Sequence, residues 1–293
     1  MTRYVLITPA RNEDGYIERT LRSVIAQTQP PERWVIVSDG STDRTDEIAS
    51  RYAASHPFIR LLRIEEETGR NFACQVYATN AGYRAMSDLE FGYVGILDAD
   101  ITFAADYYAR LLEECEKTPR LGIAGGAVID VHGDRLVASR AGSEGHHVAG
   151  GVQLFRRACY DEIGGYVPMG YGGQDVVAEV AARMKGWEVR TFPGIPAYHQ
   201  RPGPAGWRGA RARFTDGVRN YVLGTHPLYQ FGRCFRRTEP LDGLVAMAGY
   251  TWSLLRRDAR PVPPEFVRFL REEQLLRLRG RLLHFGPRRE NTR

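Results

Sequence analysis

The sequence predicts an α/β fold in which a mostly parallel central sheet is flanked by helices, followed by a helical, basic C-terminal extension. Short β-branched runs alternate with amphipathic helical stretches through the first part of the chain. Proline and glycine then gather over residues 201–209. Residues 1–200 hold 21 Lys and Arg against 27 Asp and Glu, whereas residues 201–293 hold 19 against 8. We therefore expect an α/β domain at 1–200 and a helical basic extension at 201–293.

The hydrophobic pattern defines the elements of the first domain in order. Ile17, Leu21, Val24 and Ile25 share one helical face, as an amphipathic helix requires. The other predicted helices follow the turn at 39–43 and cover 72–86 and 175–185. The predicted strands cover 4–8, 34–38, 59–64, 93–97, 121–129, 150–155 and 189–192. Residues 130–150 are rich in glycine, histidine and arginine without a clear period, and we interpret them as a mobile loop.

The composition excludes several classes of protein. Hydrophobic residues make up 43% of the chain and charged residues 26%, which excludes a wholly disordered protein. The four cysteines lie far apart without a CxxC pair, so neither a zinc ribbon nor a disulfide scaffold is predicted. No apolar run is long enough to span a bilayer, and the N-terminal run is too short for a signal peptide. We expect a reduced, cytoplasmic setting.

Polar residues collect where predicted strands end. Residues 10–14, 39–43 and 98–100 each follow a strand, and parallel sheets bind ligands beyond the carboxyl ends of their strands. Asp98 and Asp100 are two carboxylates that could hold a divalent cation against a diphosphate. Each motif also has a structural interpretation, because a solvated strand end, or a turn into a helix capped by Ser41 or Thr42, uses the same residue types.

Taken together, the motifs resemble the family 2 glycosyltransferases of the GT-A fold. The matching segments are ITPARNE at 7–13, VIVSDGSTD at 35–43, NAG at 80–82, LDAD at 97–100, GGY at 164–166, GQD at 173–175 and HQR at 199–201. The resemblance implies an inverting transferase that moves a sugar from a nucleotide-sugar, most simply a UDP-sugar, to an acceptor hydroxyl. The acceptor would be a glycan or a lipid-linked sugar in surface polysaccharide or glycolipid assembly.

The resemblance also implies a role for individual residues. The residues expected to contact the donor are Pro9, Arg11, Glu13, Asp39, Arg70 and Asp98. The residues expected to hold Mn²⁺ or Mg²⁺ are Asp98, Asp100 and His199. Asp175 resembles the catalytic base, although an Asp in a first helical turn is equally typical of a cap. The chain departs from the family at Gln174, where Glu is usual, which leaves open how the acceptor hydroxyl is held.

The basic extension predicts contact with an anionic surface. Leucines and a phenylalanine at helical spacing accompany arginines there, which predicts peripheral attachment to the inner face of the cell membrane through residues 241–285. The apolar residues of this stripe are Leu275, Leu278, Leu282 and Phe285. A C-terminal helix packed on the catalytic domain would show the same pattern. Nucleic acid is disfavoured, because the arginines accompany leucines and not a series of aromatics.

Two other classes of function compete with a transferase. A dinucleotide-dependent oxidoreductase is disfavoured, because strand 4–8 is followed by residues 9–13 and not by a glycine fingerprint. A catalytically weak, GT-A-like adaptor at the membrane surface is the other alternative. It is disfavoured because Asp39, Asp98, Asp100, Asp175 and His199 are all retained.

Overall fold

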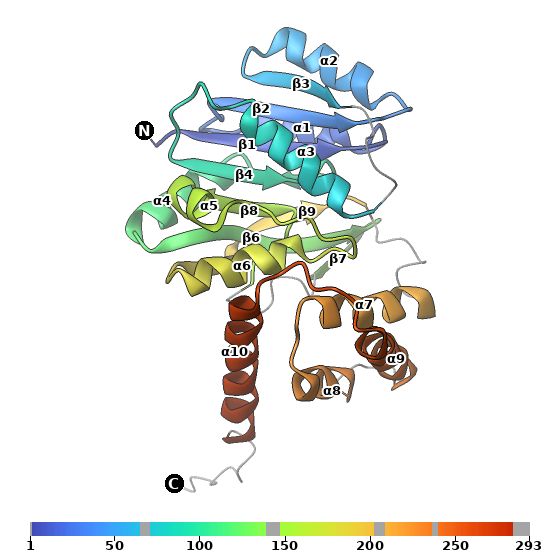
Figure 1. Ribbon diagram of the computed structural model, residues 1–293. Helices are drawn as coiled ribbons and strands as arrows, with labels where there is room; N and C mark the ends of the chain where they lie inside the picture. The colour runs from blue at the N-terminus through green and yellow to red at the C-terminus, as the bar shows by residue number, and fades with distance from the viewer. Residues whose placement is uncertain (1, 65–70, 139–146, 202–208, 236–239, 284–293) are drawn as a thin grey trace, which may run out of the picture. The chain divides into compact units, whose positions relative to one another are not determined.

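The chain forms two compact units, Met1–Gly203 and Pro204–Arg293. The computed structural model describes residues 2–64, 71–138, 147–201, 209–235 and 240–283. All the described strands belong to one sheet in the first unit, and the described elements of the second unit are helices (Figure 1).

The sheet of the first unit is mixed, and the first four strands of the chain form its parallel half. Its order is β3-β2-β1-β4-β8-β6-β9-β5, and β7 pairs with β6. Strands β1 to β4 are parallel neighbours, β8 lies antiparallel between β4 and β6, and β6 and β9 are parallel again. The carboxyl ends of β1, β2 and β4 therefore meet at one edge. The strands are β1 Tyr4–Ala10, β2 Arg33–Asp39, β3 Ile59–Ile64, β4 Tyr93–Leu97, β5 Ile101–Phe103, β6 Leu121–His132, β7 Arg135–Ala138, β8 Val152–Arg156 and β9 Glu188–His199.

Helices cover the sheet as the sequence predicts. Helix α1 buries Ile17, Leu21 and Val24, three residues of the predicted apolar face. Helix α3 packs on β1 and β2, and α6 packs on β6 and β9; Figure 1 draws both in front of the sheet. The helices of this unit are α1 Ile17–Ile25, α2 Thr45–Ser55, α3 Ala73–Arg84, α4 Tyr107–Lys117, α5 Arg157–Ile163 and α6 Gln174–Met184. The prediction of a mostly parallel sheet flanked by helices is confirmed.

The interpretation of residues 130–150 as one loop is wrong in part. Strand β6 continues to His132 and turns at Gly133 into β7, which pairs with it. Strand β9 likewise runs to His199, past the predicted end at residue 192. Both extensions depend on pairing with a neighbouring strand, which local hydrophobic pattern does not reveal. Residues 139–146 lie outside the described part of the chain.

The predicted cap of the second helix is also wrong. Helix α2 begins at Thr45, and Asp43 Oδ1 accepts a hydrogen bond from the Thr45 backbone N–H at 2.9 Å. Ser41 Oγ instead accepts from the backbone N–H of Asn12 at 3.3 Å, and Thr42 N–H donates to Asn12 Oδ1 at 2.8 Å. The polar turn after β2 therefore forms hydrogen bonds with the segment that follows β1.

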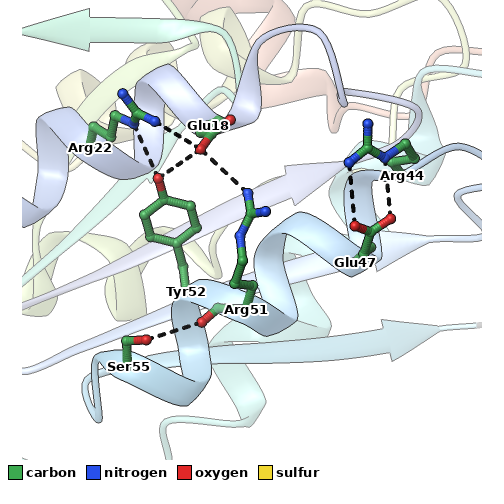
Figure 2. Close-up of polar contacts among 7 residues, drawn as sticks. All are labelled: Glu18, Arg22, Arg44, Glu47, Arg51, Tyr52 and Ser55. Atoms are coloured by element: carbon green, nitrogen blue, oxygen red, sulfur yellow. Dashed lines mark hydrogen bonds and ion pairs between the residues drawn. The ribbon is translucent and has the colours of Figure 1, made fainter.

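Helices α1 and α2 are joined at the surface by a polar network (Figure 2). Glu18 Oε1 accepts from the Tyr52 hydroxyl at 3.0 Å, from Arg22 at 3.0 Å and from Arg51 at 3.4 Å. Arg44 and Glu47 form a second, separate pair. Solvent screens these exposed charges, so they contribute little to stability.

The second unit consists of helices that pack through small residues. Its helices are α7 Ala210–Val222, α8 Pro227–Phe235, α9 Pro240–Arg256 and α10 Pro264–Leu283. A Cβ at Gly217 would lie 2.0 Å from the Ala246 carbonyl oxygen, and one at Gly249 would lie 2.0 Å from that of Phe214. The two glycines therefore allow α7 and α9 to approach each other closely. Of the described helices, none combines the length and the apolar character needed to cross a membrane.

Candidate active site

The ends of β1 and β2 bring a predicted pair of donor-binding residues together. Arg11 follows β1 and Asp39 ends β2, and the Arg11 guanidinium lies 3.6 Å from Asp39 Oδ2. Pro9 lies in β1 next to Val37 of β2. Asp39 is nearly buried, with 9% of its surface exposed. A buried carboxylate held by a guanidinium can accept hydrogen bonds from the N–H or hydroxyl groups of a nucleoside.

Glu13 and Asp100 are joined by an arginine to which the sequence assigned no role. Arg201 forms an ion pair with Glu13, and its Nε lies 3.1 Å from Asp100 Oδ2. Burial, aided by the nearby charge of Asp100 and opposed by Arg201, raises the pKa of Glu13 to about 7. The sequence did carry a signal, because Arg201 is the last residue of the matching segment HQR at 199–201.

Asp98 and Asp100 form a carboxylate pair between β4 and β5, with Asp98 half-buried and Asp100 buried. Burial, with the negative charges of Asp100, Glu13 and Asp175, raises the pKa of Asp98 to about 7. Asp100 is 8% exposed, and its Oδ1 has no hydrogen-bond partner. A buried carboxylate oxygen without a partner is costly, so it marks a place where a positive group is needed.

His199, the last residue of β9, lies beside this pair. Its Nε2 is 3.3 Å from Asp100 Oδ2, and its Nδ1 is 2.9 Å from Asp130 Oδ1. The hydrogen bond to Asp100 raises the pKa of His199 to about 9, aided by Asp130 and opposed by burial. Asp130 was missed because it falls in the segment interpreted as a loop.

The donor set fits a hard divalent cation. Asp98 and Asp100 offer carboxylate oxygens, one of them unpartnered, and oxygen ligands are those that Mg²⁺ and Mn²⁺ prefer. Within the described ranges, no three His, Cys, Asp or Glu side chains are arranged to hold an ion. Two protein carboxylates together with diphosphate oxygens of a bound nucleotide would complete such a site.

The backbone at residues 150–151 lies against both Asp98 and Asp175. A Cβ at Gly151 would lie 2.5 Å from Asp98 Oδ2, and one at Gly150 would lie 3.3 Å from Asp175 Oδ2. The Asp98 N–H also donates to the Gly151 carbonyl at 3.0 Å. A side chain at Gly151 would therefore displace Asp98, whereas one at Gly150 would press on Asp175.

Helix α6 presents Asp175 and fixes that backbone segment. Gly173, with φ 98°, occupies the N-cap position, so Asp175 is not the capping residue. One turn later, Glu179 accepts from the Val148 N–H at 2.7 Å and from His147 Nδ1 at 2.9 Å. This buried carboxylate holds the segment that leads to Gly150. His147 had no role in the sequence interpretation.

The structure thus brings together five of the predicted site residues at the carboxyl edge of the sheet. The charges of Glu13, Asp100, Asp175 and His199 all act on the pKa of Asp98. Arg11, Asp39 and Pro9 lie at the neighbouring strand ends, whereas Arg70 lies outside the described residues.

The family comparison identifies a profile that covers more than half of the chain. The profile described as "Glycosyl transferase family 2" matches residues 5–164. The glycosyltransferase TuaG of Bacillus subtilis strain 168, named for teichuronic acid biosynthesis, is 33% identical over 108 residues, which are 37% of this chain and 40% of that protein. The match therefore spans well under half of this relative.

Two solved structures share the fold at low identity. A Pyrobaculum calidifontis mannosyltransferase in complex with GDP-Man and Mn²⁺ has a TM-score of 0.58 and 19% identity, over 97% of this chain and 81% of its own. S. aureus TarS in complex with UDP-GlcNAc has a TM-score of 0.57 and 14% identity, over 88% of this chain and 74% of its own. The predicted GT-A fold is confirmed.

Proposed function

Because this chain belongs to glycosyl transferase family 2, we propose that it transfers a sugar from a nucleotide-sugar to an acceptor hydroxyl with inversion at the anomeric carbon. The observation that carries the proposal is the convergence of Glu13, Asp98, Asp100, Asp175 and His199 at one sheet edge. A UDP-sugar is the proposed donor, and a glycan or lipid-linked sugar in surface polysaccharide or glycolipid assembly is the proposed acceptor. The relative named for teichuronic acid biosynthesis and the TarS complex with UDP-GlcNAc support this choice.

The donor half of the reaction is assigned to the ends of β1, β2 and β4. Asp39 accepts hydrogen bonds from the nucleoside, and Arg11 holds that carboxylate in place. Asp98 and Asp100 would hold Mn²⁺ or Mg²⁺, which supplies positive charge to the leaving diphosphate. His199, oriented by Asp130, lies beside Asp100 and is the third residue proposed to hold the ion.

The acceptor half is assigned to helix α6. Asp175 takes the proton of the acceptor hydroxyl while that oxygen attacks the anomeric carbon and the bond to the diphosphate breaks. The absence of a side chain at Gly150 lets the backbone lie close against this carboxylate. A single displacement with the base and the leaving group on opposite faces of the sugar inverts the anomeric carbon.

A nucleotide-release assay tests the proposal. Purified protein with Mn²⁺ is incubated with a panel of UDP-, GDP- and dTDP-sugars, and release of the nucleoside diphosphate is measured with and without a pool of glycan acceptors. We expect one nucleotide class to be turned over and excess EDTA to stop it. Turnover that continues in excess EDTA would show that the reaction does not require a metal ion. No binding of any nucleoside diphosphate by calorimetry would overturn the function itself.

We also propose that the second unit attaches the protein to an anionic bilayer. Among described residues of the predicted stripe, Leu275 and Leu278 are half-buried. The Leu282 side chain and Phe285 lie outside the described structure. Strongly exposed apolar side chains occur on α8 and along α9, with one on α10: Leu228, Phe231, Phe235, Leu241, Leu244, Trp252, Leu255 and Leu276. The net charge of residues 201–293, 19 − 8 = +11, suits anionic lipid.

Flotation with vesicles of anionic phospholipid at low salt tests this attachment. The double variant Phe231→Asp/Phe235→Asp should stay at the bottom of the gradient while the parent protein floats. The matched control is Leu136→Asp, which changes an equally exposed leucine of the first unit and should float. A parent protein that does not float would contradict the proposal.

A further inference from the structure

Three side chains from separate segments form a hydrogen-bonded chain at the site. Gln75 of α3 donates through Nε2 to Asp98 Oδ1 at 3.1 Å. Gln174, the first residue of α6, donates through Nε2 to Gln75 Oε1 at 2.8 Å. The chain links the start of the helix that carries Asp175 to the carboxylate pair, and the proposed mechanism leaves both glutamines without a role.

Asp98 determines the direction of the hydrogen bonds along this chain. A glutamine amide has a donor end and an acceptor end, and the surrounding network decides which faces which neighbour. Ionised Asp98 can only accept, so Gln75 must turn its Nε2 towards it and its Oε1 away. Gln174 must then present its own Nε2 to Gln75.

One acceptor atom remains at the end of the chain. Gln174 Oε1 is buried without a hydrogen-bond partner, in a residue that is only 9% exposed. A buried carbonyl oxygen in this state calls for an O–H or N–H donor. Gln174 directly precedes Asp175, the carboxylate assigned to the acceptor hydroxyl.

We propose that Gln75 is a positioning residue that sets the direction of the Gln174 amide, so that Gln174 Oε1 accepts a hydrogen bond from a hydroxyl of the acceptor. The inference rests on the proposed function, because it needs Asp175 to face the acceptor. It also explains the departure from the family at Gln174. A glutamate there has no hydrogen to give Gln75, which would have to turn and present its oxygen to Asp98.

The test compares nucleoside diphosphate binding with acceptor use. Calorimetry with UDP and with GDP, each with Mn²⁺, which a carboxylate binds only when deprotonated, measures the donor side. We expect Gln174→Glu and Gln75→Met each to weaken binding by roughly tenfold or more, the usual effect of losing a hydrogen bond to a metal-binding carboxylate. In the Gln75→Met background, Gln174→Glu should have no further effect.

Dependence on Gln75 separates this Gln174–Gln75–Asp98 relay from a simple charge effect. An added carboxylate acts through its charge whether or not Gln75 is present, whereas the relay predicts that Gln174→Glu weakens binding only when Gln75 is present. Gln174→Met should leave nucleotide binding near the parent value and raise the acceptor KM by about tenfold, because only the acceptor contact is lost. Its kcat should change less than its KM.

A matched control guards against misfolding. Gln29→Met removes a half-buried amide that donates to the Thr2 carbonyl at 2.8 Å, outside the site, and should bind nucleotide normally. Equal weakening by Gln174→Glu in the parent and in the Gln75→Met background would overturn the relay. So would unchanged binding by Gln174→Glu. If the parent protein binds neither UDP nor GDP, the proposed function fails before the relay is tested.

Discussion

Two regions of the first unit are rich in paired charges, and they differ in burial and in what is left unpaired. At the α1–α2 surface, exposed Glu18 accepts hydrogen bonds from one tyrosine and two arginines (Figure 2). At the carboxyl edge of the sheet, Asp39 and Asp100 are buried, Glu13, Asp98 and Asp175 are half-buried, and Asp100 Oδ1 and Gln174 Oε1 have no partner. The number of ion pairs alone would not distinguish the two regions.

The pKa values of the acids shift in opposite directions in the two regions. Hydrogen bonds from Tyr52 and Arg22 lower the pKa of Glu18, so the carboxylate is charged near neutral pH. Burial and like charge raise the pKa values of Glu13 and Asp98 to about 7. Perturbed and unsatisfied groups gathered in one place are typical of a functional site, whereas a satisfied surface network is typical of a solvated helix pair.

The largest effect is expected at Asp175. Asp175→Asn keeps the size of the side chain but cannot take the acceptor proton, so kcat should fall on the order of 10²- to 10⁴-fold. Nucleotide binding should not change. Steady-state kinetics and calorimetry measure the two quantities. Asp161→Asn, an exposed acid on α5, is the control and should be fully active. Near-normal turnover by Asp175→Asn would show that another group is the catalytic base.

The next effect is expected at Asp100. Asp100→Asn removes one anionic oxygen, so the Mn²⁺ concentration needed for half-maximal nucleotide binding should rise by at least about tenfold. Titration of Mn²⁺ at fixed UDP or GDP measures the shift. The control is Asp106→Asn, an exposed acid a few residues along the chain. Identical metal titrations for parent and Asp100→Asn would exclude this residue as a ligand.

A smaller effect is expected from the titration of His199. Its folded pKa of about 9 lies above its ordinary value of 6.5, so protonation stabilises the fold. This contribution is complete below about pH 6.5 and is lost as the pH rises through about 9. In EDTA, the melting temperature of the parent should therefore fall by roughly 5 °C more over this window than that of His199→Gln. Parallel curves would show that His199 is not held between the two acids.

The smallest effect is expected at the surface network. Glu18→Gln weakens its contacts to Arg22, Arg51 and Tyr52, all at the solvent-facing junction of α1 and α2. Because solvent already screens these charges, activity should be unchanged and the melting temperature should fall only slightly. Thermal unfolding and the nucleotide-release assay measure both. Loss of turnover in this variant would show that the two regions are coupled.

Much of the fold was predictable because it depends on local pattern. The apolar face of 17–25 and the continuous apolar runs of β1, β2 and β4 determine a helix and buried parallel strands wherever they occur. The same runs end at the polar segments that follow them, so the placement of 39–43 and 98–100 at a sheet edge followed from the sequence. The resemblance to family 2 came from these segments taken together.

Tertiary structure decided the contacts between distant segments. Asp130 reaches His199 only because β6 and β9 pair, and Arg201 reaches Glu13 from 188 positions further along the sequence. Ser41 and Thr42 satisfy the local rule for a helix cap, yet they bond to Asn12 because β1 and β2 end side by side. The direction of the Gln174 amide depends on Gln75 and, through it, on Asp98. A sequence specifies which groups can donate or accept, but the partner of each group is determined only when the chain has packed.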